Sequence, residues 1–184
     1  EGRAGNDVFD GRGGFDTAVY NNDTAVNAGI TVDMAAGTVT GPAAVGTDTL
    51  QGIEAIRGTN FADIYVATGF SGSSTNAGSF GTYNEFEGLG GNDTITGNGN
   101  TRIAFYNATA GVTVDLAAGT ATGNASVGND TFTGVNNIAG SQFADTMYGS
   151  DNPQGTNEQF EGRAGNDAFD GRGGFDPAVY NNDT

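Results

Sequence analysis

The stretch from Gly2 to Tyr20 reads GRAGNDVFD followed by GRGGFDTAVY, two short units placed head to tail. Each unit is a glycine-rich turn closed by an aspartate, Asp7 or Asp16, and followed by a short apolar run. Glycine adopts positive φ at no steric cost, so such a turn can point its backbone carbonyls inward. Calcium takes about six to eight oxygen ligands, and a short turn supplies that many only if its carbonyls face the ion. The stretch therefore predicts two tight turns, each followed by a short strand; they are either plain Gly/Asn/Asp turns, which need no metal, or turns whose carbonyls face a Ca²⁺ ion.

The two units resemble the calcium-binding nonapeptide G-G-x-G-x-D-x-U-x of RTX, or haemolysin-type, proteins. The first, fourth and sixth positions match in both units, whereas Arg3 and Arg12 stand where the nonapeptide has its second glycine. The resemblance implies that each ion lies between turns stacked one coil apart, so that fold and metal binding are coupled. It also implies type I secretion and an extracellular or cell-surface location.

The candidate calcium ligands fall into a stronger and a weaker group. The stronger group consists of turn carbonyls and aspartates in close matches to the nonapeptide: Gly2, Gly5, Asp7, Gly11, Gly14, Asp16, Gly88, Gly91, Asp93, Asp167 and Asp176. The weaker group consists of aspartates in looser versions of the pattern: Asp48, Asp63, Asp130 and Asp145. For the weaker group, a calcium ligand and a plain turn-capping carboxylate are equally open, because aspartate is also a favoured turn residue.

The composition narrows the classes of function. The 184 residues include 33 glycines, no cysteine and no histidine, and the net charge is −16. Disulfides, thiol chemistry and histidine-based catalysis are therefore excluded, and no catalytic set is visible. Nucleic acid is disfavoured as a partner because no basic patch could follow the phosphates, and no apolar run approaches the about 20 residues of a membrane span. So much negative charge opposes a compact state unless cations neutralise it.

The chain repeats itself at two levels. Residues 161–184 repeat residues 1–24 with 22 of 24 positions identical, at an offset of 160. Within that long repeat, Gly29–Asp63 matches Gly111–Asp145 at 21 of 35 positions. We therefore divide the chain into a first half-repeat (1–86), a second half-repeat (87–160) and the start of the next repeat (161–184). Both ends stop within the pattern, so we expect the chain to be a segment of a longer array.

The local patterns predict an all-β fold, specifically a β-solenoid of the parallel β-roll or β-helix type. Glycines recur too often for an amphipathic helix, and β-branched residues and aromatics fill the short runs. Strands are expected at Ile30–Met34, Thr38–Thr40 and Gly46–Leu50. The predicted core comprises the apolar residues next to turns: Phe9, Phe61, Phe86, Ile95, Phe132, Phe143 and Phe160.

One unit departs from the pattern. It reads GNGNTRIAFY, and Arg102 stands in place of the aspartate. Arginine cannot bind calcium, so we expect its guanidinium to hold a carboxylate or carbonyls of the adjacent coil where an ion would otherwise lie.

Three functions remain open. The first is a calcium-stabilised structural segment of a large secreted bacterial surface protein, adhesin or matrix filament, which associates with neighbouring repeats or identical chains. The second is an accessory module of a secreted polysaccharide-modifying enzyme, protease or lipase. The third is a glycan- or ice-binding face, suggested by recurring Thr-x-Thr strands. The first is favoured, because near-identical long repeats suit a part that provides length or a lattice.

Overall fold

The computed structural model describes residues 2–152 and 157–180. In that part of the chain, all regular structure is β, with sixteen strands in one mixed sheet and no helix. The all-β prediction is thus confirmed, and no helix there is long and apolar enough to cross a membrane. The strands are β1 (Val8–Asp10), β2 (Thr17–Val19), β3 (Thr31–Asp33), β4 (Thr38–Thr40), β5 (Thr47–Gln51), β6 (Ala55–Arg57), β7 (Ile64–Val66), β8 (Asn84–Glu87), β9 (Thr94–Ala104), β10 (Thr113–Asp115), β11 (Thr120–Thr122), β12 (Asn129–Ala139), β13 (Thr146–Tyr148), β14 (Gln159–Glu161), β15 (Ala168–Asp170) and β16 (Ala178–Val179).

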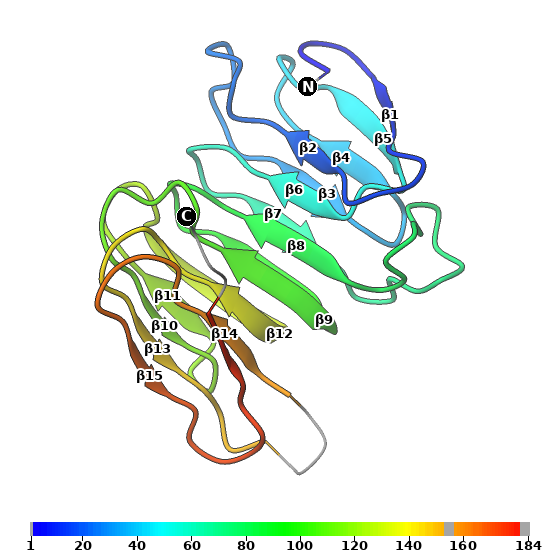
Figure 1. Ribbon diagram of the computed structural model, residues 1–184. Coiled ribbons are helices and arrows are strands. Elements are labelled where there is room, and N and C mark those ends of the chain that lie inside the picture. Colours follow the sequence, from blue (N-terminus) through cyan, green and yellow to red (C-terminus); the bar gives the residue numbers. More distant parts are fainter. Residues whose placement is uncertain (1, 153–156, 181–184) are drawn as a thin grey trace.

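Eleven strands form a main row, in the order β1-β5-β4-β3-β7-β9-β12-β11-β10-β13-β15. Most neighbours in the row are parallel. The exceptions are the β3–β4 and β10–β11 hairpins, which are inserted antiparallel next to β5 and β12. Figure 1 shows β1 at one end of the molecule and β15 at the other.

A second row runs beside the first and is parallel throughout, in the order β2-β6-β8-β9-β12-β14-β16. The long strands β9 and β12 belong to both rows, because their first residues pair in the main row and their last residues pair in the second. Elsewhere each pass of the chain gives one strand to each row. The two hairpins lengthen the main row alone.

The core lies between the rows. Alternate residues of each strand are buried there, as expected for a strand with one face inward. Val32, Leu50 and Met147 come from the main row, and Ile56 and Ile138 from the second, and all five belong to one hydrophobic cluster. The rings of Tyr65 and Phe86 stack at a centroid distance of 4.7 Å and so join the two rows.

The predicted core is partly wrong. Phe61 and Phe143 are 41% and 45% exposed, whereas Phe86, Ile95, Phe132 and Phe160 are buried. The reason is local. Each exposed phenylalanine occupies the fourth position of a turn, and its N–H donates to a hydroxyl two residues earlier, so the ring faces away from the core.

The two half-repeats fold alike, and the sheet is continuous between them. The strands β3, β4 and β5 correspond to β10, β11 and the first residues of β12, and the pairing is the same in both sets. The β8 strand contains the boundary at 86/87 and pairs with β9 of the second half. The predicted strand Thr38–Thr40 is observed as β4. The predicted strand Ile30–Met34 is one residue shorter at each end, as β3, and Gly46–Leu50 is shifted by one residue, as β5.

The outer face of the main row is rich in threonine. Across seven consecutive strands, the pairing aligns six threonines and one isoleucine, Ile64. None of the outward-facing threonines of this row is buried, and they number thirteen: Thr31, Thr38, Thr40, Thr47, Thr49, Thr94, Thr96, Thr113, Thr120, Thr122, Thr131, Thr133 and Thr146.

Candidate metal-binding turns

Within residues 2–152 and 157–180, five turns share one backbone conformation. The second residue of each has φ between 56° and 66°, and the fourth, always glycine, has φ between 123° and 134°. The second residues are Arg3, Arg12, Leu89, Arg163 and Arg172, and the fourth are Gly5, Gly14, Gly91, Gly165 and Gly174. The arginines thus accept the left-handed conformation that the missing glycine would take without strain. These five turns are the strong matches found in the sequence.

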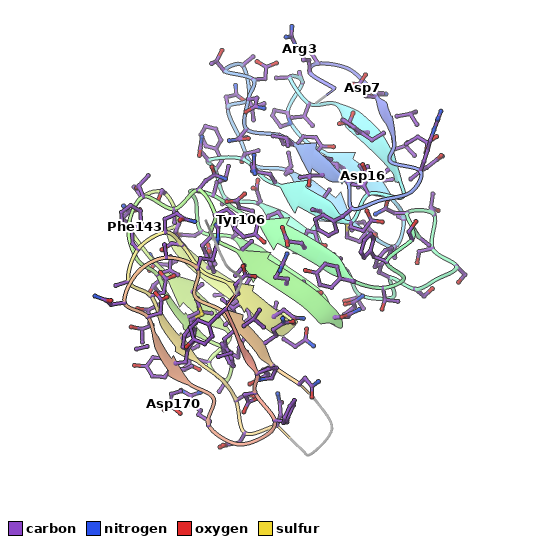
Figure 2. The ribbon with its side chains drawn as sticks, viewed as in Figure 1. Arg3, Asp7, Asp16, Tyr106, Phe143 and Asp170 are labelled. Atoms are coloured by element: carbon purple, nitrogen blue, oxygen red, sulfur yellow. The ribbon has the colours of Figure 1, made fainter. Side chains whose placement is uncertain are left out.

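Aspartates at the ends of the turns form a ladder across neighbouring strands. The N–H of Asp63 donates to Oδ1 of Asp93 at 2.9 Å, and the N–H of Asp93 donates to Oδ1 of Asp130 at 2.9 Å. Two shorter ladders have the same form: Asp7 donates to Asp48, and Asp145 donates to Asp167, both at 2.9 Å. The structure therefore brings seven of the predicted aspartates into three columns. Asp16 (Figure 2) and Asp176 lie outside them, on the turns that lead into β2 and β16 of the second row.

Burial makes the ladder costly for charged carboxylates. The pKa of Asp93 is raised to about 8 and that of Asp130 to about 7, mainly by desolvation and to a smaller extent by neighbouring carboxylates, although a backbone hydrogen bond to each acts in the opposite direction. The pKa values of Asp48, Asp63 and Asp145 are also raised, again mainly by burial, although backbone hydrogen bonds act in the opposite direction. A buried carboxylate with a raised pKa binds either a proton or a nearby cation.

Four carboxylate oxygens are buried without a hydrogen-bond partner among the described residues. They are Oδ2 of Asp7, Asp16 and Asp93, and Oδ1 of Asp176. Each belongs to the stronger group of predicted ligands. A buried oxygen without a partner costs about 1–3 kcal/mol or more when it is charged.

The first glycine of each strong turn faces the aspartate that closes it. A Cβ added at Gly2, Gly11, Gly88, Gly162 or Gly171 would overlap the carboxylate five residues later. The carboxylate therefore lies against the bare backbone of its own turn. Carboxylate and carbonyl oxygens are the donor set that Ca²⁺ prefers, so the residues present fit the ion.

The weaker group differs in its hydrogen bonding. Both oxygens of Asp63 accept hydrogen bonds, Oδ2 from the N–H of Thr59 and Oδ1 from the N–H of Ile30. Asp145 is held in the same way by Ser141 and Val112. These contacts favour the turn-capping alternative for these two aspartates.

Asp48 and Asp130 are intermediate. Asp48 accepts from the Asp7 amide and, through Oδ2, from the hydroxyl of Tyr20 at 3.1 Å. Asp130 accepts from the Asp93 amide. Asp48, on β5, is thus the last acceptor of the Asp7–Asp48 ladder, and Asp130, on β12, is the last acceptor of the Asp63–Asp93–Asp130 ladder.

Two buried glutamates that the sequence analysis did not predict lie next to Asp16 and Asp176, on the turns that lead into the second row. Oε2 of Glu54 accepts from the N–H of Asp16 at 3.0 Å, and Glu158 raises the pKa of Asp176 after the larger effect of burial. Both glutamates are buried. No repeated pattern marks Glu54, because the matching position of the other half-repeat is Asn136. Asn6 and Asn92 were also missed, and the Oδ1 of each accepts a hydrogen bond from the first N–H of the neighbouring strand in the main row, at Thr47 and Asn129.

Arg102 replaces the aspartate of its unit, so the sequence predicts no calcium site at this position. Its Nε donates to Oε2 of Glu85 on the adjacent strand at 2.6 Å, and its NH1 lies 3.5 Å from Oε2 of Glu161. The guanidinium carbon is 5.7 Å and 6.0 Å from the ring centroids of Tyr83 and Tyr106. The expectation that this arginine holds a carboxylate of the neighbouring strand is confirmed.

Among the described residues, no group of three or more acidic side chains converges on one point in a way that could hold a metal ion. A metal site here would therefore consist largely of carbonyl oxygens. No known family model matches the chain, and no curated protein matches it either.

Proposed function

We propose that the chain is a calcium-stabilised segment of a structural tandem-repeat protein. The observation that carries the proposal is the set of buried, unpartnered carboxylate oxygens at Asp7, Asp16, Asp93 and Asp176. Four of the five strong turns thus have an oxygen that lacks a donor, in a chain of net charge −16. Calcium would neutralise that charge and supply the missing partner, with Asp7, Asp16, Asp93, Asp167 and Asp176 and the glycine carbonyls of their turns as its ligands.

The strand pairing supports a solenoid. Apart from the hairpins, successive passes of the chain stack in parallel, with a strand in each of two rows. In such folds each coil contacts its neighbours alone, and stability accumulates along the array. A rod of this kind provides length, which suits repeats that are nearly identical over 24 residues at an offset of 160.

The place of such a rod is the outside of a bacterial cell, in a surface layer, adhesin or matrix filament. This follows from the resemblance of Gly2–Tyr20 and its copies to RTX nonapeptides. Millimolar calcium outside the cell would fold a chain that is unfolded during export. Neighbouring repeats, or identical chains, are the partners.

Small-angle X-ray scattering tests the structural role. In calcium, the full chain should give a compact, elongated particle, and a chain in which residues 1–160 occur twice before residues 161–184 should be longer by one repeat with an unchanged cross-section. In chelator, both should expand to flexible coils. Equal scattering curves in calcium and chelator would contradict the proposal.

The threonine face supports a second candidate, the binding of ice or of a regular glycan surface. The aligned threonines repeat about every 4.8 Å across strands and about every 6.7 Å along a strand. The residues aligned from Thr47 to Thr120 include no charged side chain. Measurement of thermal hysteresis tests ice binding, with T94K/T131K as the control variant. An accessory role in a secreted enzyme is the remaining alternative, and a catalytic domain in the same polypeptide would favour it.

A further inference from the structure

We propose that Gly2–Tyr20 and its copy Gly162–Tyr180 are interchangeable coils, so that a chain whose β5–β6 or β13–β14 edge is open binds end to end to a second copy through a coil of that copy. Either version of the coil can join the β13–β14 edge of one chain to the β5–β6 edge of another. The inference rests on the proposed tandem-repeat role and names the surfaces by which repeats join.

The coil is present twice in the structure, and each copy pairs with the rest of the chain through a different side. The β1 strand pairs with β5, which places Phe9 beside Leu50. The β15 strand, its copy, pairs with β13, which places Phe169 beside Met147. In the second row, Ala18 lies beside Ile56, and its copy Ala178 lies beside Phe160. Superposition of the two copies therefore gives continuous apolar ladders, Met147–Phe9–Leu50 and Phe160–Ala18–Ile56.

The middle of the chain shows that one coil can pair through both of its sides at once. The β9 strand is the counterpart of β1 in the second half-repeat, and it pairs with β7 on one side and β12 on the other. The aspartates agree with this arrangement. The complete ladder Asp63–Asp93–Asp130 is split at the ends of the chain into Asp145–Asp167 and Asp7–Asp48. Because residue 167 is the copy of residue 7, the two parts make one ladder of the same form.

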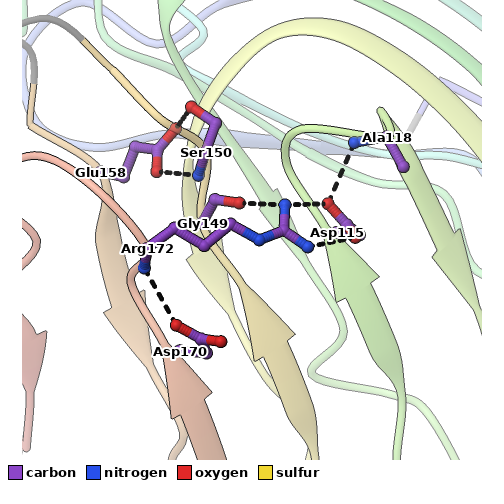
Figure 3. Close-up of polar contacts among 7 residues, drawn as sticks. All are labelled: Asp115, Ala118, Gly149, Ser150, Glu158, Asp170 and Arg172. Atoms are coloured by element: carbon purple, nitrogen blue, oxygen red, sulfur yellow. Dashed lines mark hydrogen bonds and ion pairs between the residues drawn. The ribbon is translucent and has the colours of Figure 1, made fainter.

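Side chains of the second copy, Gly162–Tyr180, have partners that their counterparts in the first copy, Gly2–Tyr20, lack. Both terminal nitrogens of Arg172 donate to Asp115, at 2.7 and 2.8 Å, and NH1 also donates to the carbonyl of Gly149 (Figure 3). Its guanidinium lies 5.4 Å from the ring centroid of Tyr148. Arg12, the equivalent residue, has an 86% exposed side chain and lies 3.6 Å from Asp10 of its own turn.

The neighbouring turn shows the same contrast. Arg163 lies 4.5 Å from the ring centroid of Tyr106, and a Cβ on Gly165 would meet the backbone of Phe143. Arg3, the counterpart of Arg163, lies at the outer end of the molecule (Figure 2). A Cβ on Gly5, the counterpart of Gly165, would meet nothing within 4 Å. The first copy thus presents the surface that β13, β14 and the turns before them cover in the second copy.

Point variants of the full chain test the exchange. Phe9→Asp should detach the first copy and open the β5–β6 edge, which then accepts β15–β16 of another chain. Phe169→Asp should open the β13–β14 edge, which then accepts β1–β2 of another chain. The double variant has open edges but no intact coil. Light scattering after gel filtration in calcium gives the mass of each form.

We expect oligomers whose mass rises with concentration for each single variant, and a monomer for the double variant. The wild-type chain should not exchange, because its own coil occupies each edge. If both single variants stay monomeric, or if the double variant associates as they do, the inference is overturned.

A second measurement covers the case in which a single variant folds poorly. A fluorescent peptide of residues 161–180 should bind Phe9→Asp at least 10-fold more tightly than it binds the wild-type chain. The same peptide carrying Phe169→Asp should bind neither, and equal binding of the intact peptide to both chains contradicts the exchange. Circular dichroism of the same samples in calcium and chelator separates the two proposals. Variants that order with calcium but do not associate contradict the exchange alone.

Discussion

The backbone N–H of Asp93 donates to Oδ1 of Asp130 at 2.9 Å, while Oδ2 of Asp93 itself is buried without a partner. The two aspartates therefore bring two carboxylates to adjacent strands and leave one oxygen unsatisfied. The arrangement is stable if that oxygen binds a proton or a cation. This links the fold to both pH and calcium.

Without calcium, the stability of the chain should fall as the pH rises from about 4 to about 8. The pKa of Asp93 is raised to about 8 and that of Asp130 to about 7 from an ordinary value of 3.8. The folded state then binds more protons than the unfolded state between these limits, so its stability is greatest below the ordinary pKa and is lost as the pH rises through the raised one. Thermal melting in chelator at several pH values measures this dependence.

Asp93→Asn separates the effects of charge and calcium. In chelator, the variant should keep its β structure to a higher pH than the wild-type chain, because it buries no charge at that position. In saturating calcium, the variant should melt at a lower temperature than the wild-type chain, because the amide is a weaker calcium ligand. A variant that is less stable than the wild-type chain under both conditions would indicate a purely structural role for Asp93.

The two groups of aspartates should respond differently to substitution. Asp7→Asn and Asp16→Asn should reduce the number of calcium ions bound per chain, because each removes an unpartnered carboxylate oxygen. Asp63→Asn should leave that number unchanged but destabilise the chain by about 1–3 kcal/mol, because Oδ2 accepts from the Thr59 amide. Calorimetric titration and urea unfolding measure the two quantities. Loss of calcium in Asp63→Asn would assign that aspartate to the ion instead.

Arg102 should stabilise the second row through its ion pair with Glu85. The side chain of Glu85 is 7% exposed, so Arg102→Met leaves a buried charge without its cation. We expect a loss of about 3 kcal/mol or more in urea unfolding, as for other broken buried pairs. The double variant with Glu85→Gln should lose less than the sum of the single variants. Additive losses would mean that the two side chains do not interact.

The left-handed arginines provide a matched pair of variants. Arg12→Gly should raise the melting temperature, because glycine takes φ 59° without strain and the exposed side chain has little to lose. Arg172→Gly relieves the same strain but removes the bonds to Asp115 and Gly149, so it should melt lower than Arg12→Gly. The pKa of Asp115 is lowered mainly by its hydrogen bonds from Arg172, so this difference should shrink below pH 4. Equal melting temperatures for the two variants would show that the Arg172 contacts add nothing.

The sequence predicted the repeated local features well. The five strong turns, the all-β class and the strand at Thr38–Thr40 each depend on neighbouring residues, and all were found. Features that depend on contacts between distant residues were less predictable. Phe61 looked like a core residue because it is large and apolar, but the turn geometry faces it outward.

The insertion of the two hairpins into one row, and the approach of Glu54 to Asp16, could not be predicted either. The first depends on how β3 pairs with β7, where Thr31 lies opposite Ile64, and the second on a contact between residues 38 positions apart. The turn signature is also the same whether or not its carboxylate is satisfied by hydrogen bonds. The sequence therefore left Asp63 and Asp145 open between ligand and cap, and the hydrogen bonds of the fold favour the cap.

A calcium titration followed by far-ultraviolet circular dichroism tests the central claim most directly, with magnesium at equal ionic strength as the control. We predict a disordered spectrum in chelator at pH 7.5 or above and a cooperative change to a β spectrum in calcium, with little change in magnesium. A full β spectrum and an unchanged melting temperature in chelator would contradict the claim that calcium completes these turns.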